Sequence, residues 1–224
     1  MNWQAIALTL KLACWVSGIL LLIGLPIAYW ITYSRWRWKF IAEAVVALPI
    51  VLPPTVLGFY VLLAIGPRGW IGKLWSSWFD RTLPFTFQGL VLASVLYSLP
   101  FAVQPFAAAF ASVDRRLIEA SWTLGASRLR TFFRVIFPLS FTGVLTGIVL
   151  SFAHTLGEFG VVLMVGGNIE GVTRTISIDI YDNVQAFDYH AAGQTALLLL
   201  IFSFAVLSIV YALNRRMWGA SPAK

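Results

Sequence analysis

The chain has 224 residues, of which 59% are hydrophobic and 11% charged, whereas about a quarter of a typical soluble domain is charged. A soluble fold of this length has too little interior for so much apolar side-chain surface, so lipid must be its main solvent. This excludes soluble enzymes and nucleic-acid-binding proteins, although the net charge is +7. The single cysteine, Cys14, excludes a disulfide framework, a cysteine-ligated iron–sulfur cluster and an attached c-type haem, and the two histidines leave little for a metal site. We expect an all-α polytopic membrane protein with no cofactor.

Five apolar segments are long enough to cross a membrane. A spanning helix needs about 20 apolar residues, because the hydrocarbon core is about 30 Å thick and each helical residue rises about 1.5 Å. In chain order, the predicted spans cover about residues 8–32, 44–66, 88–110, 135–156 and 191–213. The second contains Pro49, Pro53 and Pro54, so we expect it to be kinked, with neighbouring helices satisfying the freed carbonyl groups. The segments are continuously apolar rather than alternating, which disfavours a β-barrel.

The segment between the fourth and fifth predicted spans is too charged to face lipid. It carries Glu158, Glu170, Arg174, Asp179, Asp182 and Asp188. Its residues 159–165 are nevertheless apolar and are followed by Gly166, Gly167 and Asn168. This pattern fits a short re-entrant half-helix in the last outer loop, buried against protein rather than exposed to lipid.

The loops differ in charge, and this difference predicts the orientation. One side carries three acidic residues, Glu43, Asp114 and Glu119, and eleven basic ones. The basic residues are Arg35, Arg37, Lys39, Arg115, Arg116, Arg128, Arg130, Arg134, Arg215, Arg216 and Lys224. The other side carries five basic and six acidic residues. Because cytoplasmic loops are enriched in lysine and arginine, we expect the N-terminus outside and the C-terminus inside, which explains the basic charge without nucleic acid.

The predicted cytoplasmic loop, residues 112–134, is patterned to fold. Ser112 or Asp114 can cap a helix, and Gly125 can take the left-handed conformation that ends one. Between them, one apolar face is formed at spacings of three or four by Leu117, Ala120, Ser121 and Leu124, and Ile118 and Trp122 widen it. Residue chemistry leaves two interpretations open. The helix lies on lipid headgroups, or it lies in a groove of a protein partner, where Glu119 pairs with a basic group.

The same loop resembles the coupling motif of ABC-importer permease subunits, which reads Glu-Ala-Ala, then Gly, then Ile-x-Leu-Pro. The corresponding residues are Glu119, Ala120, Ser121, Gly125, Val135, Ile136, Phe137 and Pro138, of which Ser121, Val135 and Phe137 replace Ala, Ile and Leu with residues close in size or polarity. The resemblance extends from about residue 8 to residue 215. Residues 48–58 and 156–160 are similar to the molybdate and sulfate branch of the family, and the short outer loop 66–72 favours the molybdate permeases within it.

This resemblance implies a single ABC transmembrane domain, residues 1–224, in a bacterial inner membrane. It implies a homodimer of two permease copies over two copies of an ABC ATPase subunit, and a periplasmic oxyanion-binding protein outside. The coupling residues, with Leu124 among them, would contact the ATPase, whose closure would swing the spans from inward- to outward-open. The chain has no Gly-x-x-x-x-Gly-Lys-Ser/Thr loop, so we do not expect it to bind ATP or to be an enzyme. The implied substrate is molybdate, with sulfate, thiosulfate and tungstate as alternatives.

Five further residues are candidates for the pathway or the outer gate: Pro53, Pro54, His154, Glu158 and Arg174. His154 and Glu158 are four residues apart and would face each other on a helix. Arg174 would contact an oxyanion or the delivery protein, or would pair with a neighbouring acid. The glycines of the fourth span, Gly143 and Gly147, fit either helix packing or a pore lining.

The competing functional class is an ion-coupled secondary transporter or a channel. Such proteins place ionisable residues inside the membrane as coupling sites. The predicted spans instead have long charge-free interiors, which favours energy supplied from outside the chain. The predicted outer face has a net charge near −1 and does not attract a dianion, so we expect a soluble binding protein to deliver the substrate.

Overall fold

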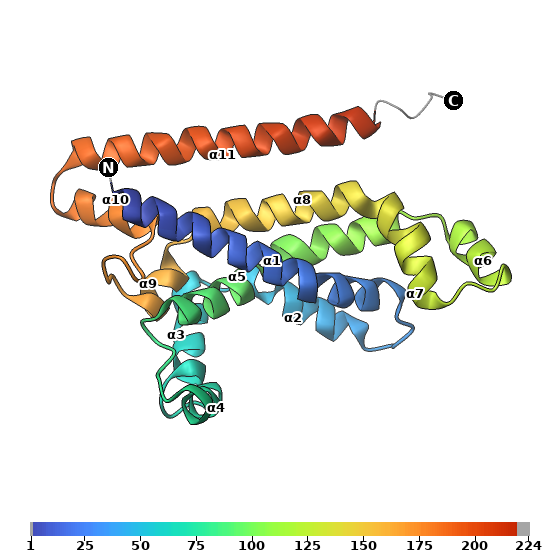
Figure 1. The fold of residues 1–224 in the computed structure, drawn as a ribbon, viewed down its shortest axis with the longest axis horizontal. Coiled ribbons are helices and arrows are strands. Elements are labelled where there is room, and N and C mark those ends of the chain that lie inside the picture. The colour runs from blue at the N-terminus through green and yellow to red at the C-terminus, as the bar shows by residue number, and fades with distance from the viewer. Residues whose placement is uncertain (1, 219–224) are drawn as a thin grey trace.

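The computed structural model describes residues 2–218, and this part of the chain is built from helices (Figure 1). They are α1 (Trp3–Tyr33), α2 (Lys39–Val51), α3 (Pro54–Ile65), α4 (Trp70–Phe79), α5 (Phe87–Ala111), α6 (Arg115–Thr123), α7 (Arg128–Thr131), the π-helical turn η1 (Phe132–Ile136), α8 (Phe137–Leu156), α9 (Gly160–Gly166), α10 (Ile176–Gln185) and α11 (Tyr189–Trp218). Four helical segments of the described chain are long and apolar enough to span a membrane, and counting the bent pair α2–α3 gives up to five. The prediction of an all-α fold with several membrane-spanning helices is therefore confirmed for the described residues. Lys224, part of the predicted basic C-terminal tail, lies outside the described residues.

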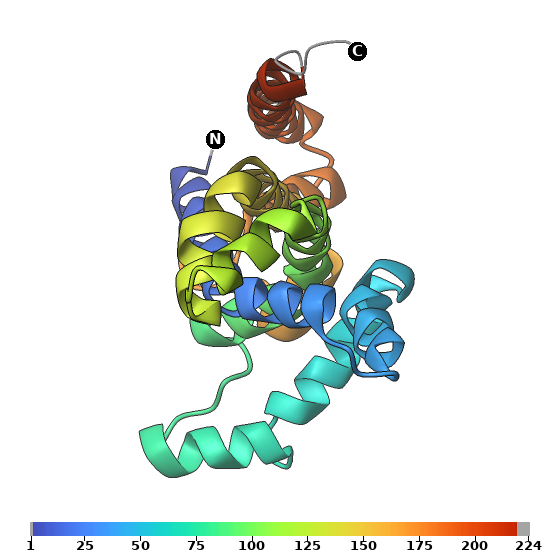
Figure 2. The same ribbon diagram turned by 90° about the vertical axis from the view of Figure 1, so that its right-hand side faces the viewer.

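Three long helices, α1, α5 and α8, run along the long axis of the molecule and form its core (Figures 1 and 2). Phe106 of α5 is fully buried between a glycine of each neighbouring helix. A Cβ atom added to Gly147 of α8 would lie 2.6 Å from the Phe106 ring, and one added to Gly24 of α1 would lie 3.2 Å from it. A Cβ added to Gly143 would overlap the Ala109 side chain of α5. Both glycines of the fourth span thus serve close helix packing.

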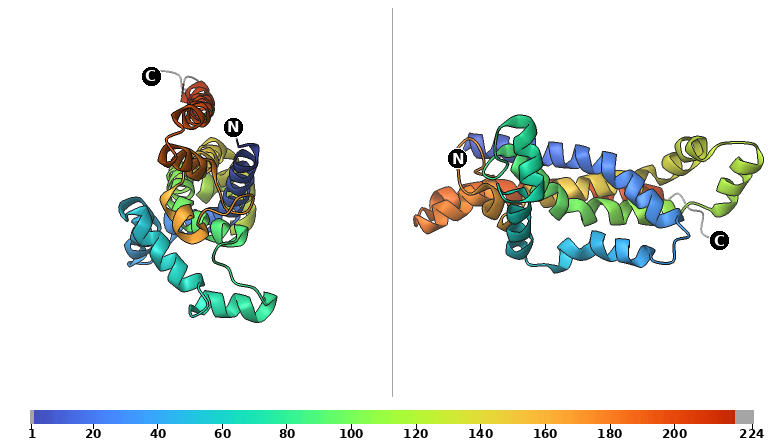
Figure 3. Two further views of the ribbon diagram at one scale, coloured as in Figure 1. Left: turned by 90° about the vertical axis from the view of Figure 1, so that its left-hand side faces the viewer. Right: turned by 90° about the horizontal axis from the view of Figure 1, so that it is seen from below.

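The second predicted span is broken rather than kinked. α2 and α3 meet at 114°, so they form either a broken span or a re-entrant loop, not one continuous helix over 44–66. Leu52 and Pro53 are extended, with ψ of 136° and 137°, because a residue that precedes a proline disfavours the helical conformation. Pro54 then starts α3 at a position where its missing N–H is no loss. As a result α2 follows the core bundle, and α3 turns across it (Figures 1 and 3).

The fourth predicted span begins earlier than expected. A continuous helical segment runs from Arg128 to Leu156, so residues 128–134, expected to be loop, are helical. Within it, the Phe137 N–H donates to the carbonyl of Phe132, five residues earlier, which makes this turn π-helical. Pro138 follows directly and has no N–H for an ordinary helical hydrogen bond, so the wider turn falls where the α-helical ladder is already interrupted.

The predicted half-helix is present as α9. Its Val161, Val162 and Val165 are fully buried, and it packs against α3 and α5. The next helix, α10, is tied to the start of α1, where the Thr9 hydroxyl accepts a hydrogen bond from the N–H of Ile176 (2.8 Å). These contacts assemble α1, α9 and α10 at one end of the core bundle, opposite α6 (Figure 1).

The last helix, α11, contacts α8 and α10 but stands apart from the core (Figures 1 and 2). Large apolar side chains such as Leu200 and Phe204 are exposed on it. In a membrane protein such a surface contacts lipid or another chain.

Candidate functional site

The predicted coupling loop folds into α6, which is capped at both ends. The Asp114 side chain accepts a hydrogen bond from the N–H of Arg116 (2.9 Å) and forms the N-cap. At the other end Gly125 has a φ of +79°, and the Ala126 N–H donates to the Ser121 carbonyl (3.1 Å). This bond and the left-handed glycine are the features of a Schellman motif. The helix predicted between Asp114 and Gly125 is therefore confirmed.

One edge of α6 packs against the chain, and the other does not. Ile118 is buried, and the Ser121 hydroxyl lies 2.9 Å from the hydroxyl of buried Thr131. Leu117 and Leu124 are exposed, Leu124 at 89%. The apolar face predicted from the sequence is thus divided. Its inner edge fixes the helix, and its outer edge points away from the described part of the protein.

Glu119 is exposed on α6 and makes no hydrogen bond or ion pair with the described residues. A single exposed charge contributes little to the free energy of folding. Ala120 is exposed beside it. The fold therefore gives Glu119 no structural task within the described chain.

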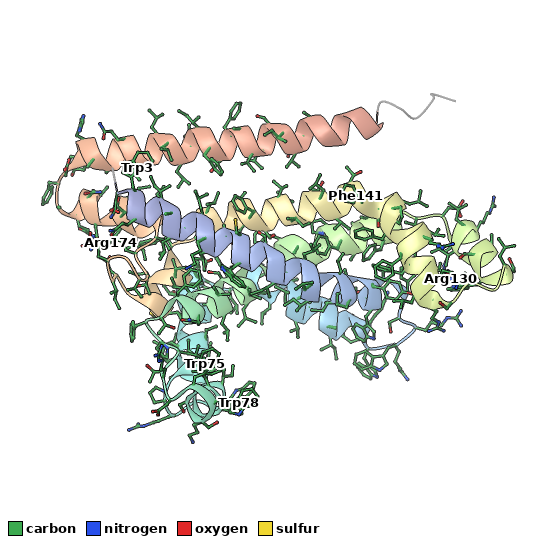
Figure 4. All side chains as sticks on the ribbon, viewed as in Figure 1. Trp3, Trp75, Trp78, Arg130, Phe141 and Arg174 are labelled. Atoms are coloured by element: carbon green, nitrogen blue, oxygen red, sulfur yellow. The ribbon has the colours of Figure 1, made fainter. Side chains whose placement is uncertain are left out.

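The end of the molecule that carries α6 is strongly basic. Five exposed arginines lie on α6 and on the helical segment after it: Arg115, Arg116, Arg128, Arg130 and Arg134. Arg130 is labelled at this end in Figure 4. Such a surface suits an acidic partner or anionic lipid headgroups.

The second half of the coupling motif lies in η1 and α8. Val135 and Phe137 are half-buried, and Pro138 is exposed. The Phe137 ring lies 6.0 Å from that of Phe132, which packs edge-on against Tyr29 of α1 at 5.4 Å. Phe137 and Phe132 therefore attach the base of the α6 region to the core, whereas Pro138 is exposed at its surface.

The remaining predicted residues lie toward the opposite end of the molecule, and the structure does not pair His154 with Glu158. Nδ1 of His154 lies 2.9 Å from the hydroxyl of Ser98 on α5, and the imidazole stacks on Phe101 with ring centroids 3.9 Å apart. Because α8 ends at Leu156, Glu158 is no longer one helical turn from His154. The sequence expectation that these two residues face each other on a helix is wrong for this reason.

Glu158 is 3% exposed and lies between α8 and α9. Within the described chain, neither of its carboxyl oxygens has a hydrogen-bond partner of acceptable geometry, and the nearby Ser94 hydroxyl is equally unpaired. Burial raises the pKa of Glu158 to about 8, and Ser94 opposes this only in part. A buried, ionised and unpaired carboxylate would be costly, so the protonated form is favoured here at neutral pH.

Pro53 and Pro54 bring α3 against α9. A Cβ added to Gly160 would lie 2.6 Å from the Cβ of Pro54, and one added to Gly58 would lie 2.8 Å from the Cβ of Met164. Contacts this short exclude a side chain at either glycine, so the two helices approach closely. Any displacement of α9, which follows Glu158, must therefore be transmitted to α3.

Arg174 is already paired within the loop between α9 and α10. Its Nε donates to Asn168 (2.7 Å), and its guanidinium lies 3.5 Å from the carboxylate of Asp182. Asn168 also donates to Asp182 (2.6 Å), which closes a three-residue network. Of the two interpretations left open for Arg174, the structure favours the structural pairing. Figure 4 shows Arg174 at the end of the molecule opposite Arg130.

Sequence reasoning missed the polar side of α5. Ser94 and Ser98 lie one helical turn apart and are fully buried, and the Ser98 hydroxyl also lies 3.0 Å from that of Thr155. Two hydroxyls spaced four residues apart inside an apolar span were the available signal. Among the described residues, no group of three or more histidine, cysteine, aspartate or glutamate side chains could hold a metal ion.

The fold and the two ends define a class of protein: a helical membrane subunit with a capped, outward-facing helix at one end and a buried polar cluster near the other. The sequence profile described as "Binding-protein-dependent transport system inner membrane component" matches residues 21–219. The chain belongs to this family of ABC-transporter permeases. It is therefore a multi-pass inner-membrane transport subunit, not an enzyme.

Relatives of known description support this assignment. The chain is 51% identical to the "Molybdenum transport system permease protein ModB" of Azotobacter vinelandii, over 97% of this chain and 96% of the relative. It is 37% identical to the protein of the same description from Escherichia coli (strain K12), over 93% of this chain and 91% of that one. Its fold matches a membrane chain in the crystal structure of a bacterial alginate ABC transporter in complex with an alginate pentasaccharide-bound periplasmic protein. That match has a TM-score of 0.72 and 21% identity, over 96% of this chain and 78% of the other.

Proposed function

We propose that this chain is the permease subunit of an ATP-driven importer that moves molybdate across the inner membrane by alternating access. The identity of 51% over nearly the whole chain to a molybdenum transport permease supports the substrate. The single structural observation that carries the mechanism is α6, which is capped, packed along one edge and exposed along the other. Sulfate, thiosulfate and tungstate are the alternative substrates, because they are oxyanions of the same class.

In this proposal, residues 1–224 form one transmembrane domain, and α6 lies in a groove of the ATPase subunit. The exposed edge with Leu117, Ala120 and Leu124 supplies the apolar contact, and Glu119 pairs with a basic group of the ATPase. Such a pair becomes buried on assembly, and losing one partner costs about 2–5 kcal/mol. Gly125 and Ser121 act indirectly, since they set where α6 ends and how it is attached.

Movement of α6 has a direct route into the membrane. Ile118 and the Ser121–Thr131 contact join α6 to the helical segment that continues without a break from Arg128 to Leu156. Val135, Phe137 and Pro138 lie where the π-helical turn meets α8, so this turn is the natural point of flexure. A push on α6 therefore reaches the far end of α8, where His154 and Glu158 lie.

We assign the outer gate to that far end. The α8–α9 junction at Glu158 and the close packing of α9 on α3 couple α8 to the broken span at Pro53 and Pro54. The buried hydroxyls and the protonated carboxyl would offer an oxyanion neutral hydrogen-bond donors once the gate opens. Arg174 has a supporting task here, since its charge is neutralised by Asp182.

The proposed assembly contains two permease copies, two ATPase subunits and a periplasmic oxyanion-binding protein, with the N-terminus outside and the C-terminus inside. The alginate transporter, whose membrane chain shares this fold, was crystallised with its own periplasmic protein. A single copy of this chain leaves α11 and other apolar surfaces exposed, which is compatible with a second copy.

Reconstitution tests this proposal. Vesicles containing the permease and its ATPase, with the binding protein added outside, should accumulate labelled molybdate only when ATP is present within. Excess tungstate should compete and excess sulfate should not, if the molybdate assignment is correct. Equal competition by sulfate would change the substrate, and ATP-independent uptake would overturn the mechanism.

Family membership favours the ATP-driven class over the ion-coupled one, although a buried carboxyl without a partner, as in Glu158, also occurs at the coupling sites of proton-coupled transporters. The two classes differ in their energy source. Uptake driven by a proton gradient in vesicles that lack ATP would favour the secondary transporter, and uptake abolished by loss of ATP alone would exclude it.

A further inference from the structure

Helix α4 carries an aromatic edge that nothing in the described part of the chain covers. Trp70, Leu74 and Trp78 are spaced by four residues and so form one edge of the helix. All three are exposed, Trp70 at 75% and Trp78 at 74%. An exposed apolar edge of this kind typically marks a surface that contacts lipid or another protein.

The neighbouring edge of α4 is firmly packed. Ile71 and Trp75 belong to a cluster with buried Val61 and Ile65 of α3 and with Leu83. A Cβ added to Gly72 would collide with backbone carbonyls at the end of α3, so α3 and α4 meet almost backbone to backbone. The exposed edge therefore belongs to a fixed element, not to a loosely attached loop.

The orientation of α4 relative to the long helices indicates where it would lie in a membrane. It lies crosswise to the long axis along which α1, α5 and α8 run, at about the level where α5 begins (Figures 1 and 2). Taking the long axis of α1, α5 and α8 as the membrane normal places α4 parallel to the membrane surface and close to the edge of the hydrocarbon. Figure 4 places Trp78 on the side of α4 that faces toward the α6 end, which is the direction in which the spanning helices extend.

The charges around α4 suit a membrane surface. Arg68 precedes the helix, Lys73 lies on it and Arg81 follows it; all three are exposed, and Asp80 is the acidic residue among them. The predicted face as a whole has more acidic than basic residues, so this basic group is local. Its charge complements the phosphate groups of anionic phospholipids.

We propose that α4 is an interfacial helix that anchors this end of the protein in the lipid headgroup layer opposite α6. Trp70, Leu74 and Trp78 insert at the boundary between headgroups and acyl chains, where tryptophan is enriched. Arg68, Lys73 and Arg81 contact lipid phosphates. A second protein copy fits less well, because the edge consists of three side chains and lies in the plane of the membrane.

This anchor has a mechanical consequence. Since α4 is fixed to α3 and α3 is packed on α9, the lipid surface resists displacement of the α3–α9 pair when movement of α8 reaches it. The anchor does not depend on the substrate, so it stands or falls separately from the molybdate assignment.

Spin labels at single cysteines test the anchor in the full-length chain. Cys14→Ser removes the only cysteine, and cysteines are then introduced one at a time at positions 70, 74 and 78, with 76 as an exposed control on the opposite side of the helix. The protein is reconstituted in vesicles of phosphatidylethanolamine and phosphatidylglycerol. Collision with oxygen, which concentrates in lipid, is compared with collision with a nickel chelate, which stays in water.

The anchor predicts that the ratio of oxygen to nickel collisions is high at 70, 74 and 78 and low at 76, following the helical period of about 3.6 residues. Replacing phosphatidylglycerol by phosphatidylcholine should lower the ratio at the first three positions. High nickel collision at all four positions would overturn the proposal in favour of an aqueous helix. Low collision with both reagents at 70, 74 and 78, with spin–spin broadening, would overturn it in favour of contact with a second copy.

Discussion

Burial of the Glu158 carboxyl group, without a hydrogen-bond partner among the described residues, makes its ionised form unfavourable in the folded protein. Both carboxyl oxygens are buried without a hydrogen bond from the described residues, and burial raises the pKa of the group from 4.5 to about 8. Such a group favours its protonated state in the folded protein and ionises readily in the unfolded chain. The pH dependence of stability is therefore a direct readout of its surroundings.

We predict that stability falls as the pH rises from about 5 to about 8. The folded pKa of Glu158 lies above the unfolded value, so the folded state binds the extra proton in this window, and stability is lost as the pH approaches the folded pKa. Glu158→Gln, which keeps the shape without the charge, should flatten this dependence. Thermal unfolding of both proteins in detergent at several pH values measures it. Equal pH dependence of the two proteins would show that Glu158 is hydrated or paired.

Gly125 is a second residue whose backbone limits substitution. Its φ of +79° costs a residue with a side chain about 1–2 kcal/mol, although nothing lies within 4 Å of an added Cβ. We expect Gly125→Ala to lower the midpoint of thermal unfolding and to reduce ATPase coupling, and Gly125→Asn, which tolerates this conformation better, to do so less. Gly193→Ala, also in open space but without the positive φ, is the matched control and should be neutral. If both alanine variants behaved alike, the left-handed turn after α6 would be unimportant.

At the scale of elements, the close contact of α5 with α8 depends on glycine. Gly147→Ala would place a methyl group 2.6 Å from the Phe106 ring and force the helices apart. Overpacking of this kind costs about 1–3 kcal/mol. Gly18→Ala on α1, where an added Cβ meets nothing within 4 Å, is the control and should leave stability unchanged or raise it slightly. Chemical denaturation in mixed micelles compares the two, and equal midpoints would contradict the packing described for Phe106.

The positions of the spanning helices were predictable because they follow from the length of apolar runs. The 114° break between α2 and α3 was not, because a Pro53-Pro54 pair signals an interruption without fixing its angle. That angle is set by contacts distant in sequence, namely Gly58 and Pro54 against α9. The early start of the fourth span was missed because exposed arginines on 128–134 are compatible with a helix end as well as with a loop.

In the candidate site, too, some features were predictable from the sequence and others were not. Asp114 and Gly125 were predictable as helix ends because capping depends on local sequence. The environment of His154 was not, because Ser98 and Phe101 reach it from another helix. Local patterns therefore predicted the elements, whereas the partners of buried polar groups required the tertiary structure.

At the scale of the whole molecule, the two functional ends lie far apart, with α6 at one end and α9, α10 and the anchor helix α4 at the other (Figure 1). The helical segment from Arg128 to Leu156 joins them, as does α5, which contacts α9 at one end and leads into α6 at the other. In the proposed mechanism it transmits ATPase movement to the outer gate. Rigid packing of α8 on α5 makes this transmission efficient, because closely packed helices move together.

Glu119→Lys should separate assembly from folding. The side chain is exposed and unpaired with the described residues, so we expect the unfolding midpoint to change little. If Glu119 pairs with a basic group of the ATPase, reversal of its charge should weaken co-purification of the ATPase strongly, by about tenfold or more. Glu170→Lys, the same reversal at an exposed acid between α9 and α10 at the other end of the molecule, serves as the charge control. Unimpaired recovery of ATPase with Glu119→Lys would leave this residue a solvated surface charge.

The most direct test of the central claim is a crosslink from α6 to the ATPase subunit. In the Cys14→Ser background, a photoreactive probe on Leu124→Cys should crosslink to the ATPase in membranes that contain both subunits, whereas the same probe on Ser77→Cys of α4 should not. Nucleotide binding should change the yield at position 124. If the probe at 124 captured only phospholipid, with the ATPase present and active, α6 would be a membrane-surface helix and the proposed coupling would be wrong.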